Sequence, residues 1–242
     1  MKATNWEFKY RAMVFGLIIG VSFSLYAFDP KMAGPELADW LAPRFAMDAP
    51  VLTRVVLALA AAVLAVAAMT RTWASAYLQA GVVYASKVKT EALVADGPYR
   101  RVRNPLYLAN VLMGLGMGLL MSRSGFLVCV VAMVIFCYRL IFREEAELLA
   151  TQGESYRQYV AAVPRLWPAL TARIPSAGRE ASWGNGFKAE AWYWGFAVAA
   201  AALAITLNGK LFLILIAASV GLFWLTSSQA EKKAAEPPVP PA

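Results

Sequence analysis

The sequence has no histidine, only two cysteines and little charge, and each shortage excludes a class of function. Without histidine, the usual zinc hydrolase sites, the Ser-His-Asp triad and the Glu-x-x-His di-iron site are excluded, and we expect no bound metal. Cys129 and Cys137 lie within one apolar run, which is typical of core residues rather than of a disulfide or a metal-binding pair. Charged residues make up 16% of the 242 residues, against roughly 25% in soluble domains. We therefore place the chain among integral membrane proteins.

Long apolar runs predict an all-α fold, a polytopic membrane helix bundle. A helix needs about 20 apolar residues to cross a hydrocarbon core of about 30 Å. Several runs are somewhat shorter, so each of these alone could be a buried or re-entrant helix. Their spacing and charged flanks favour a bundle of about six transmembrane helices. The predicted spans are residues 12–28, 52–69, 106–121, 126–142, 192–207 and 211–226.

The basic residues predict the orientation of these spans. With the N-terminus inside, 18 of the 23 Lys and Arg residues lie on the cytoplasmic side, as the positive-inside rule predicts. Both termini are then cytoplasmic. The net charge of +8 reflects this topology and contact with anionic headgroups, so membrane lipids rather than nucleic acid are the expected partners. The exceptions on the outer side are Lys31, Arg44, Arg54, Arg123 and Lys210.

The chain divides by composition into consecutive parts. Residues 1–70 hold the first two spans, and residues 71–168 hold the third and fourth spans with two long cytoplasmic segments. Residues 169–230 add a C-terminal hairpin, and residues 231–242 form a proline-rich tail that we expect to be disordered. The outer loop, residues 29–50, is long enough for a short surface helix.

The segment after the fourth span predicts two amphipathic helices on the membrane surface. Apolar residues recur at near-helical spacing on both sides of Gly153. Pro164 and Pro168 then end the second helix.

Residues 97–107, GPYRRVRNPLY, allow two interpretations. Asn104 is a favoured N-cap, Pro105 is a favoured first helical residue, and the arginines are ordinary positive flanks of a span. The same arrangement brings the positive end of a helix and several arginines to the headgroup level, where they could hold a carboxylate or a phosphate. Taken alone, the stretch favours the structural interpretation.

The inner end of the fourth run, CYRLIFREEAELL, carries a second unusual group of charges. Arg139 lies inside the apolar run, where an ionisable group is costly unless it has a function or snorkels to the interface. Arg143 and Glu147 are four residues apart and predict an ion pair along the helix. Glu144 and Glu145 point about 100° apart, so at least one faces inward, where it would form a polar pocket beside Arg139.

Two stretches in this order, LVADGPYRRVRNPLYLAN and RLIFREEAELLATQGESYRQYVAAVPRLWP, closely resemble the isoprenylcysteine carboxyl methyltransferase and phospholipid methyltransferase family of integral membrane enzymes. The shared elements are a GPY turn, an R-[HN]-P-x-Y helix start, an arginine five residues before a Glu-Glu pair, and a G-x-x-Y-x-x-Y-x-x-x-V-P ending. The resemblance implies S-adenosyl-L-methionine as cofactor, in a site facing the cytoplasm, and a lipophilic methyl acceptor that enters from the lipid.

By position, the resemblance also assigns residues, of which Arg139 and Glu144 are the expected catalytic pair. Glu144 would hold the charged amino acid part of the cofactor, and Arg139 would face the acceptor. The family's commonest motif has histidine where this chain has Asn104, and an asparagine hydrogen-bonds but cannot become cationic. The residues expected to line the cofactor are Leu93, Val94, Tyr99, Asn104, Tyr107 and Glu144.

The leading hypothesis is therefore a membrane methyltransferase that methylates the carboxyl group of an isoprenylcysteine-like substrate. One alternative is methylation of a phospholipid amine, or of another small molecule at nitrogen or sulfur. A second is an NADPH-dependent membrane reductase of the sterol type, and a third is a scaffold without activity. The Glu-Glu pair and the GESY stretch favour the methyltransferase over the reductase.

Overall fold

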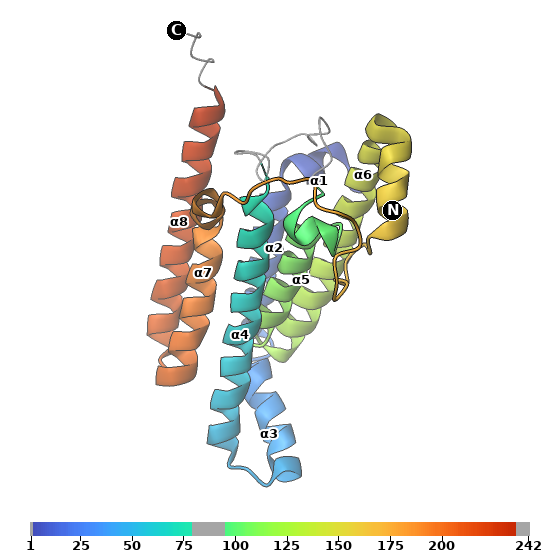
Figure 1. Cartoon of the computed structure of the whole chain (residues 1–242). Coiled ribbons are helices and arrows are strands. Elements are labelled where there is room, and N and C mark those ends of the chain that lie inside the picture. Colours follow the sequence, from blue (N-terminus) through green and yellow to red (C-terminus); the bar gives the residue numbers. More distant parts are fainter. Residues whose placement is uncertain (1, 79–94, 236–242) are drawn as a thin grey trace.

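The structure, a computed structural model, describes residues 2–78 and 95–235, with residues 225–235 described by their backbone only. In these ranges every regular element is a helix, so the all-α prediction is confirmed (Figure 1). The only β-type pairing among them is an isolated bridge between Met32 and Ser122. The elements are α1 (Asn5–Lys9), α2 (Arg11–Ser24), the 3-10 helix η1 (Leu25–Ala27), α3 (Ala33–Phe45), α4 (Ala49–Ala76), the 3-10 helix η2 (Gly97–Arg100), α5 (Pro105–Gly118), α6 (Arg123–Ala162), α7 (Trp183–Thr206) and α8 (Gly209–Ala235).

Helix α4 lies in the middle of the bundle. It packs against α7 and α5, and α3 folds back along its first half (Figure 1). Helix α8 packs on α7, while α6 packs on α5 and α2. Helix α1, η2 and the C-terminal end of α8 lie at one end of the bundle, which we call the inner end, and the α5–α6 turn lies at the opposite, outer end. Helices α5 and α6 form one helical hairpin, and α7 and α8 form the expected C-terminal hairpin.

Within the described part of the chain, three helices are long and apolar enough to cross a membrane, namely α4, α6 and α7. The other apolar helices are shorter: residues 11–27, α5 and residues 209–224. At 1.5 Å per residue, the 14 residues of α5 span about 21 Å, which is less than the hydrocarbon core. The structure thus supports a membrane protein, while the count of six spans and the sidedness of the termini stay predictions.

Helix α6 bends sharply at Gly153, where the backbone takes φ 55° and ψ −122°. A left-handed φ of this kind favours glycine, which explains why the break falls there. The chain is helical on both sides, as predicted, and the second piece folds back beside the first (Figure 1). Its Tyr156, Tyr159 and Val163 are buried and pack against Ala95.

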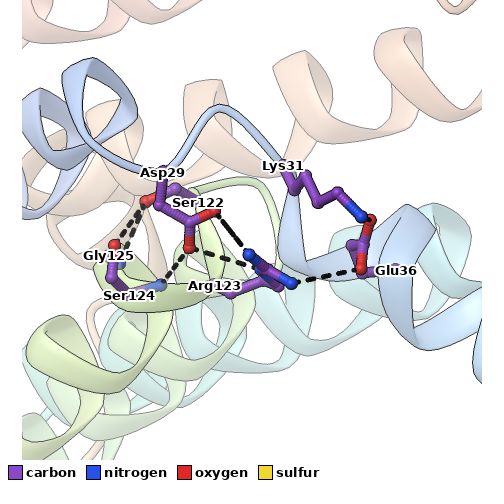
Figure 2. Close-up of polar contacts among 7 residues, drawn as sticks. All are labelled: Asp29, Lys31, Glu36, Ser122, Arg123, Ser124 and Gly125. Atoms are coloured by element: carbon purple, nitrogen blue, oxygen red, sulfur yellow. Dashed lines mark hydrogen bonds and ion pairs between the residues drawn. The ribbon is translucent and has the colours of Figure 1, made fainter.

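The outer end is held by charged contacts between the first loop and the α5–α6 turn (Figure 2). Asp29 accepts hydrogen bonds from the Arg123 guanidinium and from the Ser124 backbone N–H, each at 3.0 Å. Glu36 pairs with Lys31 at 3.0 Å and with Arg123 at 3.5 Å. The hydrogen bond from Arg123 holds the pKa of Asp29 below its ordinary value. These residues lie far along the bundle from the predicted site, so we assign them a structural role.

Two sequence predictions need adjustment at the chain's loops and tail. The outer loop does carry a helix, α3, but with 13 residues it is a substantial element that packs on α4. Helix α8 continues to Ala235, so residues 231–235 of the predicted disordered tail are helical. The physical reason is composition, since Glu, Lys and Ala favour helix and the prolines begin only afterwards. Residues 236–242 lie outside the described residues.

Candidate functional site

The GPY turn forms η2, shortly before α5. The loop between α6 and α7 forms hydrogen bonds with the residue that precedes this turn. Asp96 precedes the turn and accepts hydrogen bonds from the Ser176 hydroxyl at 2.6 Å and from the Ala177 and Arg179 backbone N–H groups at 3.1 and 3.0 Å. The Ser176 hydrogen bond holds the pKa of Asp96 below its ordinary value. Gly97 has φ 56°, and a Cβ there would lie 2.3 Å from the Tyr77 ring, so both its conformation and its surroundings require glycine.

Tyr99, the third residue of η2, is buried. Its backbone carbonyl accepts a 2.8 Å hydrogen bond from the Tyr159 hydroxyl on the second piece of α6. Burial raises the pKa of Tyr99 well above its ordinary value, and Tyr159 and Glu144 add to the effect. The phenol is therefore neutral at physiological pH and available for hydrogen bonding and stacking.

Asn104 occupies the predicted N-cap position of α5, with Pro105 as the first helical residue, but its side chain makes no capping hydrogen bond. Instead its amide N–H donates to Glu145 and to the Arg165 carbonyl, both at 3.1 Å. The side chain thus ties the start of α5 to α6 and to the chain after it. The capping role expected for this side chain is wrong, because two part-buried acceptors compete for it.

Glu145 is the centre of a compact ion cluster. Arg103 and Arg165 approach its carboxylate at 3.1 and 2.9 Å, and only 11% of the Glu145 side chain is exposed. Arg103 also donates to the Val160 and Val163 carbonyls, each at 2.7 Å, and so satisfies the end of α6. Sequence reasoning missed this cluster, although the Glu-Glu pair and the arginines of the two resembling stretches were visible.

Glu144 has different partners from its neighbour. The Tyr107 hydroxyl donates a 2.7 Å hydrogen bond to its carboxylate. Among the ion pairs of residues 2–78 and 95–235, none includes Glu144, although Arg11 and Arg143 act on it electrostatically at longer range. A half-buried carboxylate with a neutral hydrogen-bond donor is suited to receive a cationic group of a ligand.

The Arg139 side chain pairs with α1 and not with Glu144. Its guanidinium makes a two-pronged ion pair with Glu7 of α1, with hydrogen bonds of 3.0 and 2.8 Å to the two carboxylate oxygens. The expected polar pocket with Glu144 is therefore replaced by a contact with the N-terminal helix, because these two side chains leave α6 in different directions. The hydrogen bonds from Arg139 lower the pKa of Glu7 to about 2. The predicted pair of Arg143 with Glu147 is confirmed, at 2.8 Å.

The structure therefore brings some of the predicted residues together and separates others. Tyr107 contacts Glu144 directly, while Asn104 joins the adjacent cluster around Glu145. Tyr99 lies within electrostatic reach of Glu144. Leu93 and Val94 lie outside the described residues.

A second buried polar cluster, which sequence reasoning missed, joins α4, α5 and α7. Arg71 pairs with Glu190, whose side chain is fully buried, and also donates to the Asn110 side-chain oxygen at 2.9 Å. Ser75 donates to Glu190 at 2.6 Å, and the Tyr193 hydroxyl donates to Asn110. The only signal for this cluster in the sequence is that Arg71 and Glu190 each stand beside an apolar run. A charge in that position is also an ordinary cytoplasmic flank of a span.

Comparison with known proteins relates part of this chain to one family. The sequence model of the phospholipid methyltransferase family matches residues 55–153, which contain Arg71, Asn110, Tyr107 and Glu144. The cobalt-zinc-cadmium resistance protein CzcN of Cupriavidus metallidurans is 33% identical over 90 residues, which cover 37% of this chain and 41% of the relative. No solved structure matches the chain. The resemblance noted in the sequence is thus confirmed as a match of residues 55–153 to the phospholipid methyltransferase family model.

Proposed function

We propose that this protein is a membrane methyltransferase that uses S-adenosyl-L-methionine and methylates a lipophilic acceptor. The observation that carries the proposal is the contrast between Glu144 and Glu145. Two arginines neutralise Glu145, whereas a tyrosine hydroxyl alone hydrogen-bonds Glu144 among the described residues. A carboxylate that lacks a close cation stabilises an ammonium group placed beside it, and the cofactor's amino acid part carries one.

The residues at the inner end fit such a ligand in other respects. Tyr107 holds the Glu144 carboxylate in place, and the Asn104–Glu145 contact braces the start of α5 against α6. Tyr99 supplies a buried aromatic ring nearby. Asp96 ties the loop of residues 176–179 to the start of η2. When bound, S-adenosylmethionine supplies an electrophilic methyl group on a sulfonium, and transfer from it depends mainly on positioning.

For the acceptor, we propose a carboxylate on an isoprenylcysteine-like molecule. An ionised carboxylate needs no general base, which suits a chain without histidine. Arg139 could orient such a group through a two-pronged contact, and that contact is now made by the Glu7 carboxylate. An anionic acceptor at this position would compete with Glu7.

Radiolabelled methyl transfer tests the reaction class and the acceptor together. Detergent-purified protein is incubated with methyl-labelled S-adenosylmethionine and either an S-farnesyl cysteine analogue or phosphatidylethanolamine. We expect label on the farnesyl cysteine analogue, released as volatile methanol by base because the product is an ester. Label that is stable to base would indicate transfer to nitrogen or sulfur. Absence of label on every acceptor tested would argue against the proposal.

Matched substitutions link any transfer to the site. Glu144→Gln keeps the size and hydrogen bonding of the side chain but removes its charge, so we expect transfer to fall at least about tenfold. Glu147→Gln changes a carboxylate on the same helix that already pairs with Arg143, and we expect little effect.

A further inference from the structure

The buried cluster of Arg71, Glu190, Asn110 and Tyr193 spans the boundary between the family segment and the rest of the chain. Arg71 and Asn110 belong to α4 and α5, inside residues 55–153. Glu190 and Tyr193 belong to α7, outside that segment. Glu190 has no exposed surface, and only 10% of the Arg71 side chain is exposed.

Burial of this ion pair needs several hydrogen bonds at once. Glu190 accepts from Arg71 and Ser75, and the Asn110 oxygen accepts from Arg71 and Tyr193. The Arg71 guanidinium also lies 4.6 Å from the centre of the Tyr193 ring. A buried ion pair of this kind contributes little net stability compared with apolar side chains of similar size. Its directional hydrogen bonds instead fix the positions of α4, α5 and α7 relative to one another.

The geometry that the cluster fixes is that of α5. Asn110 lies three residues after Tyr107, so the two side chains project from neighbouring faces of successive turns. Asn110 is held by groups of α4 and α7, while Tyr107 contacts Glu144 of α6. A rotation or shift of α5 that breaks the first contact also moves the second.

The cluster also lies close to η2. The turn packs against α4, and the Ser182 backbone N–H donates a 2.8 Å hydrogen bond to the Ala76 carbonyl at the end of α4. A Cβ on Gly186 would lie 2.6 Å from the Thr72 carbonyl, so α7 approaches α4 as closely as backbone allows. Arg71 and Glu190 both act electrostatically on the Tyr99 phenol. The start of α7 is therefore part of the same inner-end assembly as the predicted cofactor residues.

We propose that Glu190 is a positioning residue of the methyltransferase site, which acts through Arg71 and Asn110 to fix α5 and so aim Tyr107 at Glu144. The inference rests on the proposed function. It assigns the C-terminal hairpin a role in the reaction, beyond that of a membrane anchor.

A double variant that removes both charges distinguishes a role in positioning α5 from a role in folding. The double variant Arg71→Met, Glu190→Leu replaces the ion pair with apolar side chains, and such replacements commonly keep or raise stability. We expect it to melt near the wild-type temperature but to bind S-adenosylmethionine about tenfold more weakly. Wild-type affinity in a stable double variant would overturn the inference.

Tyr193→Phe provides a second, milder test, because it removes only the hydroxyl that holds Asn110. We expect an unchanged melting temperature and a several-fold rise in the Kd for S-adenosylmethionine. Trp194→Phe is the matched control, since it removes a 3.1 Å hydrogen bond to Thr72 across the same α4–α7 interface but outside the cluster. Equal affinity of both variants and the wild type would again contradict the inference.

These results also distinguish the inference from the proposed function. If the wild-type protein itself does not bind S-adenosylmethionine, the proposed function fails and the positioning role fails with it. If the wild type binds and the cluster variants bind equally well, only the positioning role fails.

Discussion

Glu144 and Glu145 are neighbours on α6, yet their carboxylates have opposite electrostatic surroundings. Arg103 and Arg165 neutralise Glu145, whereas Glu144 accepts a hydrogen bond from the Tyr107 hydroxyl. The 100° step of a helix sends the two side chains to different partners. One carboxylate therefore holds the inner end together, and the other is the one that we propose binds the cofactor.

Glu145→Gln should destabilise the protein strongly. The substitution leaves the buried Arg103 guanidinium without its counter-charge, which costs about 3 kcal/mol for a buried pair. The part-exposed Arg165 loses the same partner and adds less. Thermal unfolding in detergent measures the loss. Glu154→Gln is the control, because its pair with Arg157 is exposed and should contribute less than about 1 kcal/mol. Equal melting temperatures for the two variants would show that the cluster does not stabilise the fold.

Tyr107→Phe should weaken cofactor binding without unfolding the protein. The variant keeps the ring and removes only the hydroxyl that holds Glu144, a loss of about 1 kcal/mol or a several-fold change in Kd. Titration of S-adenosylmethionine reports the change. Tyr138→Phe, on α6 next to Phe142, is the control and should bind as the wild type does. Unaltered binding by Tyr107→Phe would remove this tyrosine from the site.

The contact between α1 and α6 should be lost in acid, because it depends on the ionised carboxylate of Glu7. Its pKa lies at about 2 in the folded protein because of Arg139, below the ordinary value of 4.5. Since the folded pKa is lowered, the stabilisation is complete above about pH 4.5 and disappears as the pH falls toward 2. Amide hydrogen exchange of α1 measured between pH 6 and pH 2 should show this loss, and Glu7→Gln should already show it at pH 6. Constant protection in both proteins would contradict the assignment.

The same substitution tests the acceptor role of Arg139. If an anionic acceptor competes with Glu7, then Glu7→Gln should lower the KM for a farnesyl cysteine carboxylate several-fold and leave the Kd for S-adenosylmethionine unchanged. Steady-state methyl transfer measures the KM, and calorimetric titration measures the Kd. A KM that stays the same, with α1 released, would place the acceptor elsewhere.

Asp96→Asn should loosen the loop over η2. The carboxylate accepts from the Ser176 hydroxyl and from backbone N–H groups of Ala177 and Arg179, and an amide offers one acceptor oxygen in place of two. We expect faster trypsin cleavage at Arg173 or Arg179, at a protease concentration that spares the wild type. Ser155→Ala, on the exposed surface of α6, is a suitable control. Identical cleavage rates would mean that other contacts hold the loop.

Hydropathy predicted the helices well because length and apolar composition are local properties of the chain. The start of α5 at Pro105 and the break at Gly153 were also predictable, since each depends on one residue's backbone preference. The partners of Asn104, Arg139 and Glu190 were not. They depend on how helices rotate against one another, and Arg71 and Glu190 are 119 residues apart in the sequence.

Calorimetric titration of S-adenosylmethionine into the purified protein tests the central claim most directly, with NADPH titrated separately and with Glu144→Gln and Glu147→Gln as paired variants. We expect S-adenosylmethionine to bind and NADPH not to bind, and only Glu144→Gln to weaken binding, by at least about tenfold. Absence of S-adenosylmethionine binding to the wild type, or equal binding by both variants, would contradict it. Binding of NADPH alone would point instead to a reductase.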